Sequence, residues 1–428
     1  MHCLKIQGGN QISGSITIAG NKNAALPMIA AAMLSEEEVI LHNVPDILDV
    51  RNMLAIAEVL GADYTFHNGS LRLRPNLQAV TSLPAELCAR IRASLLFAGP
   101  VATRCGEITI APPGGDIIGR RRLDGHFYGL RKLGIEMQEE NHCFHFIRRG
   151  QLQGADIFLD EASVTATEHI MMVAALAKGK TIIRNAACEP HVTQLAELLN
   201  AMGGKISGMD TNQLHIEGVP QLGGAELTLD GDHIEAASYL SLCAACGGQL
   251  TLTGKLPPRH YWMTRRVFER FGLDVVLRPN RITLENHSGL QVVPDFGHAI
   301  PVIADGPWPQ FPSDMLSCMV TVATQARGTV LFFEKMFESR LYFVDKLIAM
   351  GANIVVCDPH RVVVSGPAQL HGCEISSPDI RAGMALVIAA CCANGESILK
   401  NTAMLERGYS HLTAKLLSLG CKVQESEI

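Results

Sequence analysis

The fold is decided by a pattern that is clearest in the stretch Met350-Gly351-Ala352-Asn353-Ile354-Val355-Val356-Cys357-Asp358-Pro359-His360-Arg361-Val362-Val363-Val364. Apolar residues at helical spacing run from Tyr342 up to the glycine, and a glycine just after such a segment is typical of a helix stop. The β-branched residues that follow predict two strands, 353–357 and 362–364, joined by a turn at 358–361. The stretch therefore predicts a helix, a glycine stop and an antiparallel hairpin.

The same pattern occurs six times along the chain, at intervals of roughly 70 residues. In each copy an apolar residue and a glycine precede an alternating strand; the glycines are Gly61, Gly134, Gly203, Gly272, Gly351 and Gly420. A second element has the same phase: an Ala-rich apolar helix, a break and a short β-branched strand, clearest at 171–183 and 385–399. Each unit is thus helix, strand, helix and hairpin, which predicts a mixed sheet. Six such units form either an open solenoid or two closed groups of three, and 428 residues favour two domains with a boundary near 229–232.

Composition excludes several classes of protein. The net charge of −6 and the pI near 6.2 argue against general nucleic-acid binding, so a basic site must be local. No apolar run approaches the length of a membrane span and the N-terminus lacks a signal-peptide pattern, so we expect a cytoplasmic protein without membrane insertion. The 13 cysteines are scattered, and the CxxC at Cys243 and Cys246 has no second pair at zinc spacing. We therefore expect reduced, packed thiols, no metal and no cofactor.

The most unusual local feature is the loop 112–126, which holds four glycines, two prolines and the consecutive arginines Arg120, Arg121 and Arg122. Guanidinium groups bind phosphate oxygens in a bidentate manner, so the loop suits a phosphate-bearing ligand. The segment alone is equally compatible with a solvated basic turn.

Taken with the six-fold repeat, a series of motifs resembles the enolpyruvyl transferases over essentially the whole chain, in order. These motifs are Gly20-Asn21-Lys22-Asn23-Ala24-Ala25-Leu26-Pro27, Arg92-Ala93-Ser94, the Pro-Gly-Gly loop, Asp232-His233-Ile234-Glu235, Phe311-Pro312-Ser313-Asp314, Phe337-Glu338-Ser339-Arg340 and Arg407-Gly408-Tyr409. The loop motif and the Lys-Asn-Ala-Ala-Leu-Pro start are similar to the branch that acts on UDP-N-acetylglucosamine rather than on 3-phosphoshikimate. The resemblance implies a two-domain inside-out α/β barrel with three units per domain. It places the first domain at 22–230, with loop 112–126 as a lid that closes on substrates, and the second at 1–21 plus 231–428.

The resemblance also implies a reaction and its residues. A sugar hydroxyl attacks C2 of phosphoenolpyruvate while C3 takes up a proton, and the adduct then loses phosphate and that proton, in the first committed step of peptidoglycan precursor synthesis. Asp314 matches the carboxylate near the attacking hydroxyl, with a helix N-cap as the alternative role. The anion-binding positions are matched by Lys22, Arg92, Arg121, Arg340, Arg381 and Arg407; substrate contacts are implied for Asn23, Arg122, Asp124, His126, Ser163 and Val164.

Asp116 departs from the family pattern, because most members carry a cysteine there as general acid for C3. A carboxylic acid in this position predicts a fosfomycin-insensitive enzyme, since the drug reacts with the thiolate. The nucleotide pocket also differs, at Leu96, Arg122, Gly125, His233 and Glu406. Two alternatives therefore stay open: a relative that uses another nucleotide acceptor such as UMP, and a non-catalytic ligand-binding relative.

Overall fold

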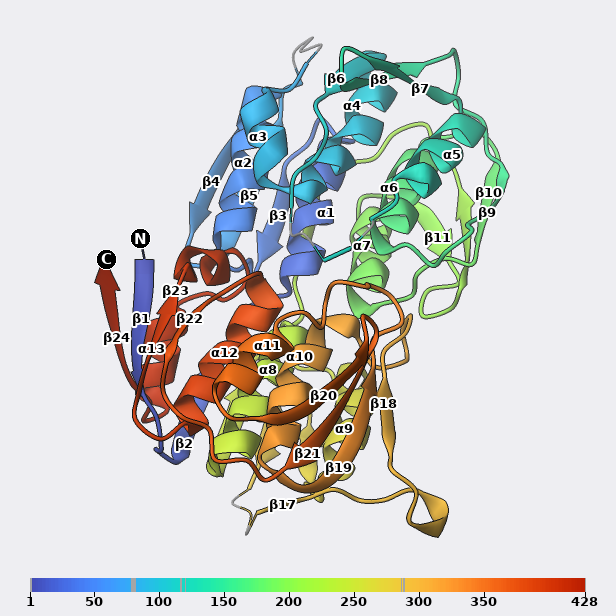
Figure 1. Ribbon diagram of the computed structural model, residues 1–428. Coiled ribbons are helices and arrows are strands. Elements are labelled where there is room, and N and C mark those ends of the chain that lie inside the picture. Colours follow the sequence, from blue (N-terminus) through green and yellow to red (C-terminus); the bar gives the residue numbers. More distant parts are fainter. Residues whose placement is uncertain are drawn as a thin grey trace. The chain divides into compact units, whose positions relative to one another are not determined.

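The computed structural model describes residues 2–77, 82–115, 118–119, 121–285, 287 and 289–427. The chain divides into two compact units (Figure 1). Unit 1 comprises Met1–Ala19, Asp116–Arg120 and Asp230–Ile428, and unit 2 comprises Gly20–Gly115 and Arg121–Leu229.

Unit 2 contains three sheets, with strand orders β13-β3-β5-β4, β6-β8-β7 and β11-β12-β10-β9. Its elements are α1 (Lys22–Ala32), β3 (Val39–His42), α2 (Leu48–Val59), β4 (Ala62–His67), β5 (Ser70–Pro75), α3 (Ala85–Arg90), η1 (Arg92–Phe97), α4 (Ala98–Cys105), β6 (Glu107–Ile110), α5 (Asp124–Leu133), β7 (Ile135–Glu140), β8 (Cys143–Arg148), β9 (Asp156–Phe158), α6 (Val164–Ala174), β10 (Lys180–Arg184), α7 (Pro190–Ala201), β11 (Lys205–Ser207), β12 (Gln213–Glu217) and β13 (Ala225–Thr228).

Unit 1 also contains three sheets, ordered β15-β16-β14-β2, β17-β19-β21-β20 with β18 beside β19, and β22-β23-β1-β24. Its elements are β1 (His2–Gln7), β2 (Ile12–Thr17), α8 (His233–Cys246), β14 (Gly248–Thr253), η2 (Pro258–Tyr261), α9 (Trp262–Glu269), β15 (Val275–Arg278), β16 (Arg281–Leu284), β17 (Leu290–Gln291), η3 (Phe296–His298), β18 (Val302–Ala304), α10 (Ser313–Thr324), β19 (Ala326–Phe333), α11 (Val344–Ala349), β20 (Asn353–Asp358), β21 (Arg361–Gly366), β22 (Glu374–Ser376), α12 (Ile380–Cys392), β23 (Glu396–Lys400), η4 (Thr402–Arg407), α13 (Leu412–Ser418) and β24 (Lys422–Glu427).

The six sheets confirm the predicted repeat. Four of them combine one parallel strand pairing with two antiparallel ones. The five-stranded sheet has two parallel pairings, of β17 and β18 with β19, beside its two antiparallel ones. In β6-β8-β7 a parallel bridge between Ser82 and Thr109 stands beside the antiparallel strands. The quoted hairpin is present as β20 and β21, with Val356 opposite Val362. The six repeat glycines all have a positive φ, from 73° to 106°, which suits a residue that follows a helix.

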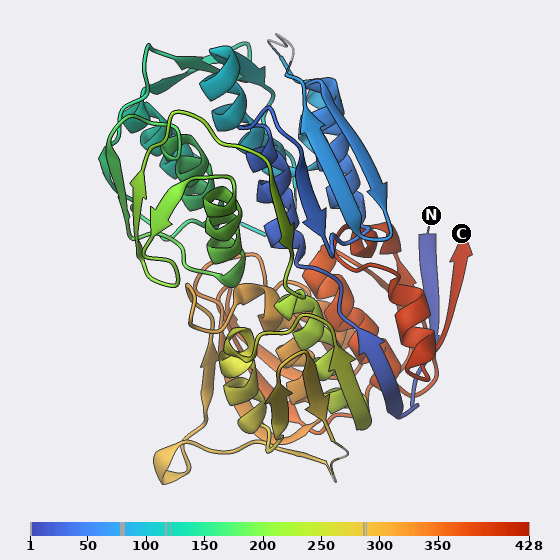
Figure 2. The same cartoon turned by 180° about the vertical axis from the view of Figure 1, so that it is seen from behind.

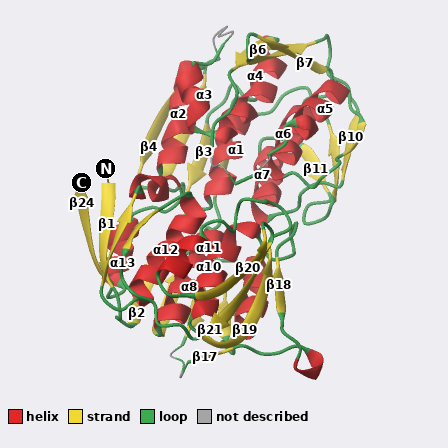
Figure 3. Ribbon diagram, in the orientation of Figure 1, coloured by secondary structure: helices red, strands yellow, loops and turns green. Residues whose placement is uncertain are grey.

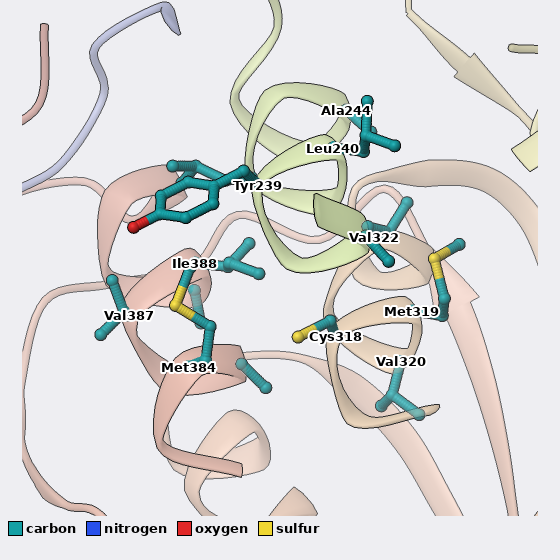
Figure 4. Close-up of a cluster of buried hydrophobic side chains, with 14 of the residues drawn as sticks. Tyr239, Leu240, Ala244, Cys318, Met319, Val320, Val322, Met384, Val387 and Ile388 are labelled. Carbon is teal, nitrogen blue, oxygen red and sulfur yellow. The ribbon is translucent and has the colours of Figure 1, made fainter. Parts of the chain in front are cut away.

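Apolar helices form the interior of each unit. In unit 1, α8, α10 and α12 are buried on nearly all sides, as expected for helices that are hydrophobic all round. Their side chains point toward one another in the core, among them Tyr239 from α8, Cys318 from α10 and Met384 from α12 (Figure 4). Figure 3 shows the strands of unit 1 outside these helices. In unit 2, α1 is the corresponding fully buried helix.

The described strands form six separate sheets that pack on the buried helices and do not close into a β-barrel. Sheets outside and helices inside are what the predicted inside-out α/β fold requires. One detail differs from the expectations. In the sixth copy β24 is not followed by a hairpin partner; it pairs with β1, which also pairs with β23 (Figures 1 and 2). The N-terminal strand thus completes the last sheet of unit 1.

Within the described part of the chain, no helix has both the length and the apolar character needed to cross a bilayer. The same residues hold no group of three or more His, Cys, Asp or Glu side chains placed to bind a metal ion.

Candidate functional site

The start of α1 places Lys22 at the edge of unit 2. Asn21 caps the helix by accepting a hydrogen bond from the Asn23 amide at 2.8 Å. A side chain at Gly20 does not fit, since its Cβ would lie 1.6 Å from the Asn43 carbonyl oxygen. This close approach lets the chain turn directly into the helix, so Lys22 and Asn23 occupy its first turn.

Lys22 forms a buried ion pair. Its Nζ lies 2.7 Å from Asp49 Oδ2, and the side chains are 10% and 2% exposed. The partner comes from the first turn of α2, so the two helix starts lie together. A buried lysine held by a carboxylate keeps one orientation, which leaves its remaining N–H donors in a fixed position.

Arg92 and Arg121 bring two guanidinium groups together. Arg92 Nη2 donates to the main-chain carbonyls of Arg121 and Arg122 at 3.0 and 3.1 Å. Burial, followed by the charge of Arg121, lowers the pKa of Arg92 to about 10, while Glu161 opposes this shift. An anion bound beside these groups would relieve the repulsion between them.

Arg122 lies in a different environment from Arg121. Its Nε is 3.2 Å from Asp124 Oδ2 and its Nη2 is 4.0 Å from Asp160 Oδ2, and all three side chains are well exposed. Arg122 and Asp124 therefore form a surface ion pair at the start of α5. Asp116 lies outside the described residues.

His126 belongs to a buried hydrogen-bond chain. The Gly99 amide donates to His169 Nε2 at 2.7 Å, so the proton of His169 is on Nδ1. That proton is donated to His126 Nδ1 at 3.0 Å, and His126 Nε2–H donates to Thr165 Oγ1 at 3.0 Å. Burial lowers the pKa of both histidines, that of His169 to about 3, so both rings are neutral. The chain joins α5 to the start of α6.

Ser163 and Val164 mark that start. Ser163 is the N-cap of α6: its Oγ accepts from the Ala166 amide at 3.4 Å and its carbonyl accepts from Thr167 Oγ1 at 2.8 Å. Val164 is the first residue of the helix, and both side chains are partly exposed. A ligand can therefore reach the side chains of Ser163 and Val164, while the helix start fixes their backbone.

In unit 1, Asp314 is held by two arginines. Its Oδ1 accepts from Arg340 Nη2 at 2.7 Å and its Oδ2 accepts from Arg381 Nε at 3.1 Å. The arginine side chains are 4% and 5% exposed, whereas that of Asp314 is 31% exposed. The N-cap alternative for Asp314 is wrong, because the cap of α10 is Pro312 and makes no side-chain hydrogen bond. The carboxylate is instead oriented by its two ion pairs with arginines.

The two arginines are themselves fixed. Arg381 follows the N-cap Asp379, whose Oδ1 accepts its amide at 2.8 Å, and its guanidinium lies 5.5 Å from the centroid of the Tyr409 ring. Arg340 Nε is buried and has no hydrogen-bond partner among the described residues. Arg407 ends η4 and is partly exposed. This cluster presents positive charge around one oriented carboxylate.

Glu334 holds the segments that carry Asp314 and Arg340 in place through hydrogen bonds. Its Oε2 accepts from Ser313 Oγ at 2.7 Å, and its Oε1 accepts from the amides of Met336 and Phe337 at 3.1 and 3.0 Å. Burial, and then the neighbouring Asp305, raise the pKa of Glu334 to about 8. A protonated Glu334 therefore fixes both the start of α10 and the turn that leads to Arg340.

Sequence reasoning missed several residues that build the site: Asp49, His169, Thr165 and Glu334. Each acts through a partner that is distant in sequence or belongs to another helix, so no local pattern reveals it. The structure brings together Asp314, Arg340 and Arg381 in unit 1, and Arg92 with Arg121 in unit 2.

Residues 6–416 match the family model of EPSP synthase (3-phosphoshikimate 1-carboxyvinyltransferase). A UDP-N-acetylglucosamine 1-carboxyvinyltransferase from Treponema denticola is 51% identical over 428 residues and is covered completely, as is this chain. The proteins of the same name from Borreliella burgdorferi and Bradyrhizobium diazoefficiens are 48% and 45% identical; the alignments cover 99% and 98% of this chain and 99% and 97% of theirs.

Solved structures show the same fold. The enolpyruvyl transferase NikO from Streptomyces tendae superimposes with a TM-score of 0.87 at 22% identity, over 99% of both chains. EPSP synthase from Acinetobacter baumannii superimposes with a TM-score of 0.78 at 16% identity, over 100% of both chains. These two likenesses confirm the predicted fold class.

Proposed function

Because the chain belongs to the UDP-N-acetylglucosamine 1-carboxyvinyltransferases of the EPSP synthase family, we propose that it uses the residues above to move the enolpyruvyl group of phosphoenolpyruvate to the 3′-hydroxyl of UDP-N-acetylglucosamine. The chain is an enolpyruvyl transferase of peptidoglycan synthesis. The two substrates are small molecules, and the reaction takes place in the cytoplasm.

The observation that carries the residue assignment is the pairing of Asp314 with Arg340 and Arg381. A carboxylate with both oxygens oriented and a partly exposed side chain can accept the proton of a sugar hydroxyl. The hydroxyl oxygen then attacks C2 of phosphoenolpyruvate. Asp314 is the general base of this step, and the arginines fix its direction.

Cations stabilise the anionic adduct. The phosphate and carboxylate of phosphoenolpyruvate carry negative charge that is rearranged in the tetrahedral adduct, and fixed guanidinium and ammonium groups lower the energy of that state. Lys22, Arg92, Arg121 and Arg407 take this role, with Arg340 and Arg381. Asn23, Asp124, Ser163 and Val164 bind the acceptor, and Arg122 lies beside them on the surface. His126 was expected to contact the acceptor as well, but it is buried and both of its ring nitrogens are hydrogen-bonded within the protein, so it positions the start of α6 instead.

The C3 proton comes from Asp116, which stands where most family members have cysteine. It donates a proton to C3 during addition and takes it back when phosphate leaves. The proton that Asp314 removed from the sugar hydroxyl leaves with the phosphate, so both carboxyl groups return to their starting states. Cys88, whose carbonyl accepts from the Gly114 amide at the start of the same loop, is a poor substitute. It is fully buried, and burial raises the pKa of its thiol.

Phosphate release tests the proposal. The purified chain is incubated with phosphoenolpyruvate and either UDP-N-acetylglucosamine or UMP, and inorganic phosphate is measured with time. We expect release that depends on UDP-N-acetylglucosamine, with a new product that is heavier by one enolpyruvyl group. Phosphate release with UMP but not with UDP-N-acetylglucosamine would mean that the chain uses another nucleotide acceptor. No release with either nucleotide would contradict enolpyruvyl transfer.

A further inference from the structure

Two pairs of thiols lie at the C-terminal ends of α8 and α12 in unit 1. Cys246 ends α8 and Cys392 ends α12, and their Sγ atoms are 3.4 Å apart. The preceding residue of α12, Cys391, has its Sγ 4.0 Å from that of Cys421. All four are free cysteines, and the transfer reaction uses none of them.

The geometry of the first pair suits a disulfide. A disulfide needs its sulfurs about 2.05 Å apart, so the two Sγ atoms must approach by roughly 1.4 Å. Both residues end their helices: Gly247 after α8 has φ 77°, and Ala393 after α12 is extended. Side-chain rotation with a small shift of these helix ends can supply the approach.

Exposure separates the two pairs. Cys246 and Cys392 are partly exposed, whereas Cys391 and Cys421 are 4% and 5% exposed. Thiol–disulfide exchange requires access of the oxidant to one sulfur. The first pair is therefore the one that a small oxidant can reach.

We propose that Cys246 and Cys392 are a reversible disulfide site, oxidised by a low-molecular-weight disulfide of the glutathione type. One protein thiolate attacks the small disulfide, forms a mixed disulfide and releases one small thiol. The second protein thiolate then attacks the mixed disulfide and releases the other. Two protein thiols and one small disulfide become one protein disulfide and two small thiols, so atoms and electrons balance.

The order of attack follows from the thiol contact. The hydrogen bond with Cys392, and then burial, raise the pKa of the Cys246 thiol well above its usual range. The thiolate of Cys246 is therefore disfavoured while this contact lasts, so Cys246 is the sulfur that closes the link, after a mixed disulfide at Cys392 has removed the contact.

The cross-link would tie two of the three central helices of unit 1 together. It joins residues 146 apart in sequence, and closing a long loop stabilises mainly by restricting the unfolded chain. Cys392 and Arg381 lie at opposite ends of α12, a helix of 13 residues that is about 18 Å long. The link should therefore raise stability and leave the transfer activity unchanged.

Peptide mapping tests the site. The folded chain is incubated with oxidised glutathione, blocked with an alkylating agent and digested, and linked peptides are identified by mass. We expect a peptide pair joined through Cys246 and Cys392, reversed by dithiothreitol. Cys391→Ala, the matched control one residue away, should keep the link, and Cys392→Ala should abolish it.

Thermal melting gives an independent readout. The oxidised wild type should melt at least ~5 °C above the reduced form, because the closed loop is long. The same treatment should leave the melting of Cys392→Ala unshifted. A link through Cys391 and Cys421, no link at all in the folded wild type, or a linked form with unchanged melting would each overturn the proposal.

Discussion

The paired arginines of unit 1 and those of unit 2 have different partners. In unit 1, Arg340 and Arg381 share one carboxylate, Asp314, at 2.7 and 3.1 Å. In unit 2, Arg92 lies beside Arg121 and donates to main-chain carbonyls, and burial together with that neighbouring charge lowers the pKa of Arg92 to about 10. In the first arrangement a carboxylate holds the two arginines together and offsets part of their charge, whereas in the second the repulsion between the arginines is relieved only when an anion binds.

This difference indicates two different roles for the two arginine pairs in the reaction. A cluster held together by ion pairs keeps a fixed geometry, which suits the orientation of a general base in the chemical step. A cluster of like charges gains most when an anion binds, which suits capture of a phosphate-bearing substrate. Substitution of Asp314 should therefore lower kcat, and substitution of Arg92 should raise KM.

The largest effect is expected at Asp314. Asp314→Asn keeps the size of the side chain but removes the base and one charge that balances two arginines, so kcat should fall by about 10²–10⁴-fold. Steady-state phosphate release measures this, with circular dichroism as the control for folding. A folded Asp314→Asn enzyme with kcat within threefold of wild type would show that the proton goes elsewhere.

A smaller effect is expected at Arg92, and Arg122 is its matched control. Arg92→Ala removes charge-assisted hydrogen bonds worth about 1.5–3 kcal/mol, so KM for phosphoenolpyruvate should rise by about 10–100-fold. Arg122→Ala should change it less than about threefold, because exposed ion pairs contribute little. An equal rise of KM in the two variants would contradict the different roles assigned to Arg92, which is partly buried beside Arg121, and to Arg122, which forms a surface ion pair.

The smallest effect concerns stability and pH, and is expected at Glu334. Its pKa is about 8 when folded and near the ordinary 4.5 when unfolded. Between these values the folded chain binds a proton that the unfolded chain releases, so the free energy of unfolding falls as pH rises from 4.5 through 8. Glu334→Gln cannot titrate and should show a shallower decline of the melting temperature over this range. Parallel declines in the two proteins would contradict the raised pKa.

The sequence was sufficient to predict the repeat, because each copy has local signals. The six glycines, the helical spacing before them and the β-branched runs after them all report on neighbouring residues. Closure of the sixth sheet by β1 was not predicted, since its partner strand lies at the other end of the chain.

The candidate site was predicted in part. The resemblance named Lys22, Asp314 and Arg381 from motifs, but it gave no partner for Lys22 and left a helix cap open for Asp314. Their contacts, with Asp49 and with Arg340 and Arg381, depend on packing between helices that are separate in sequence. Charged residues have many possible partners, so only the fold selects one.

We propose that this chain performs the family reaction with a carboxylic acid, Asp116, where most members use a thiol. The intact mass and residual activity of the enzyme, measured after long incubation with fosfomycin in the presence of UDP-N-acetylglucosamine, test this role of Asp116. We expect the wild type to stay active and unmodified, because carboxylates are much weaker nucleophiles than thiolates. Asp116→Cys should gain a single adduct and lose activity. Rapid covalent labelling of the wild type would contradict this role, because another nucleophile would then occupy the position assigned to Asp116.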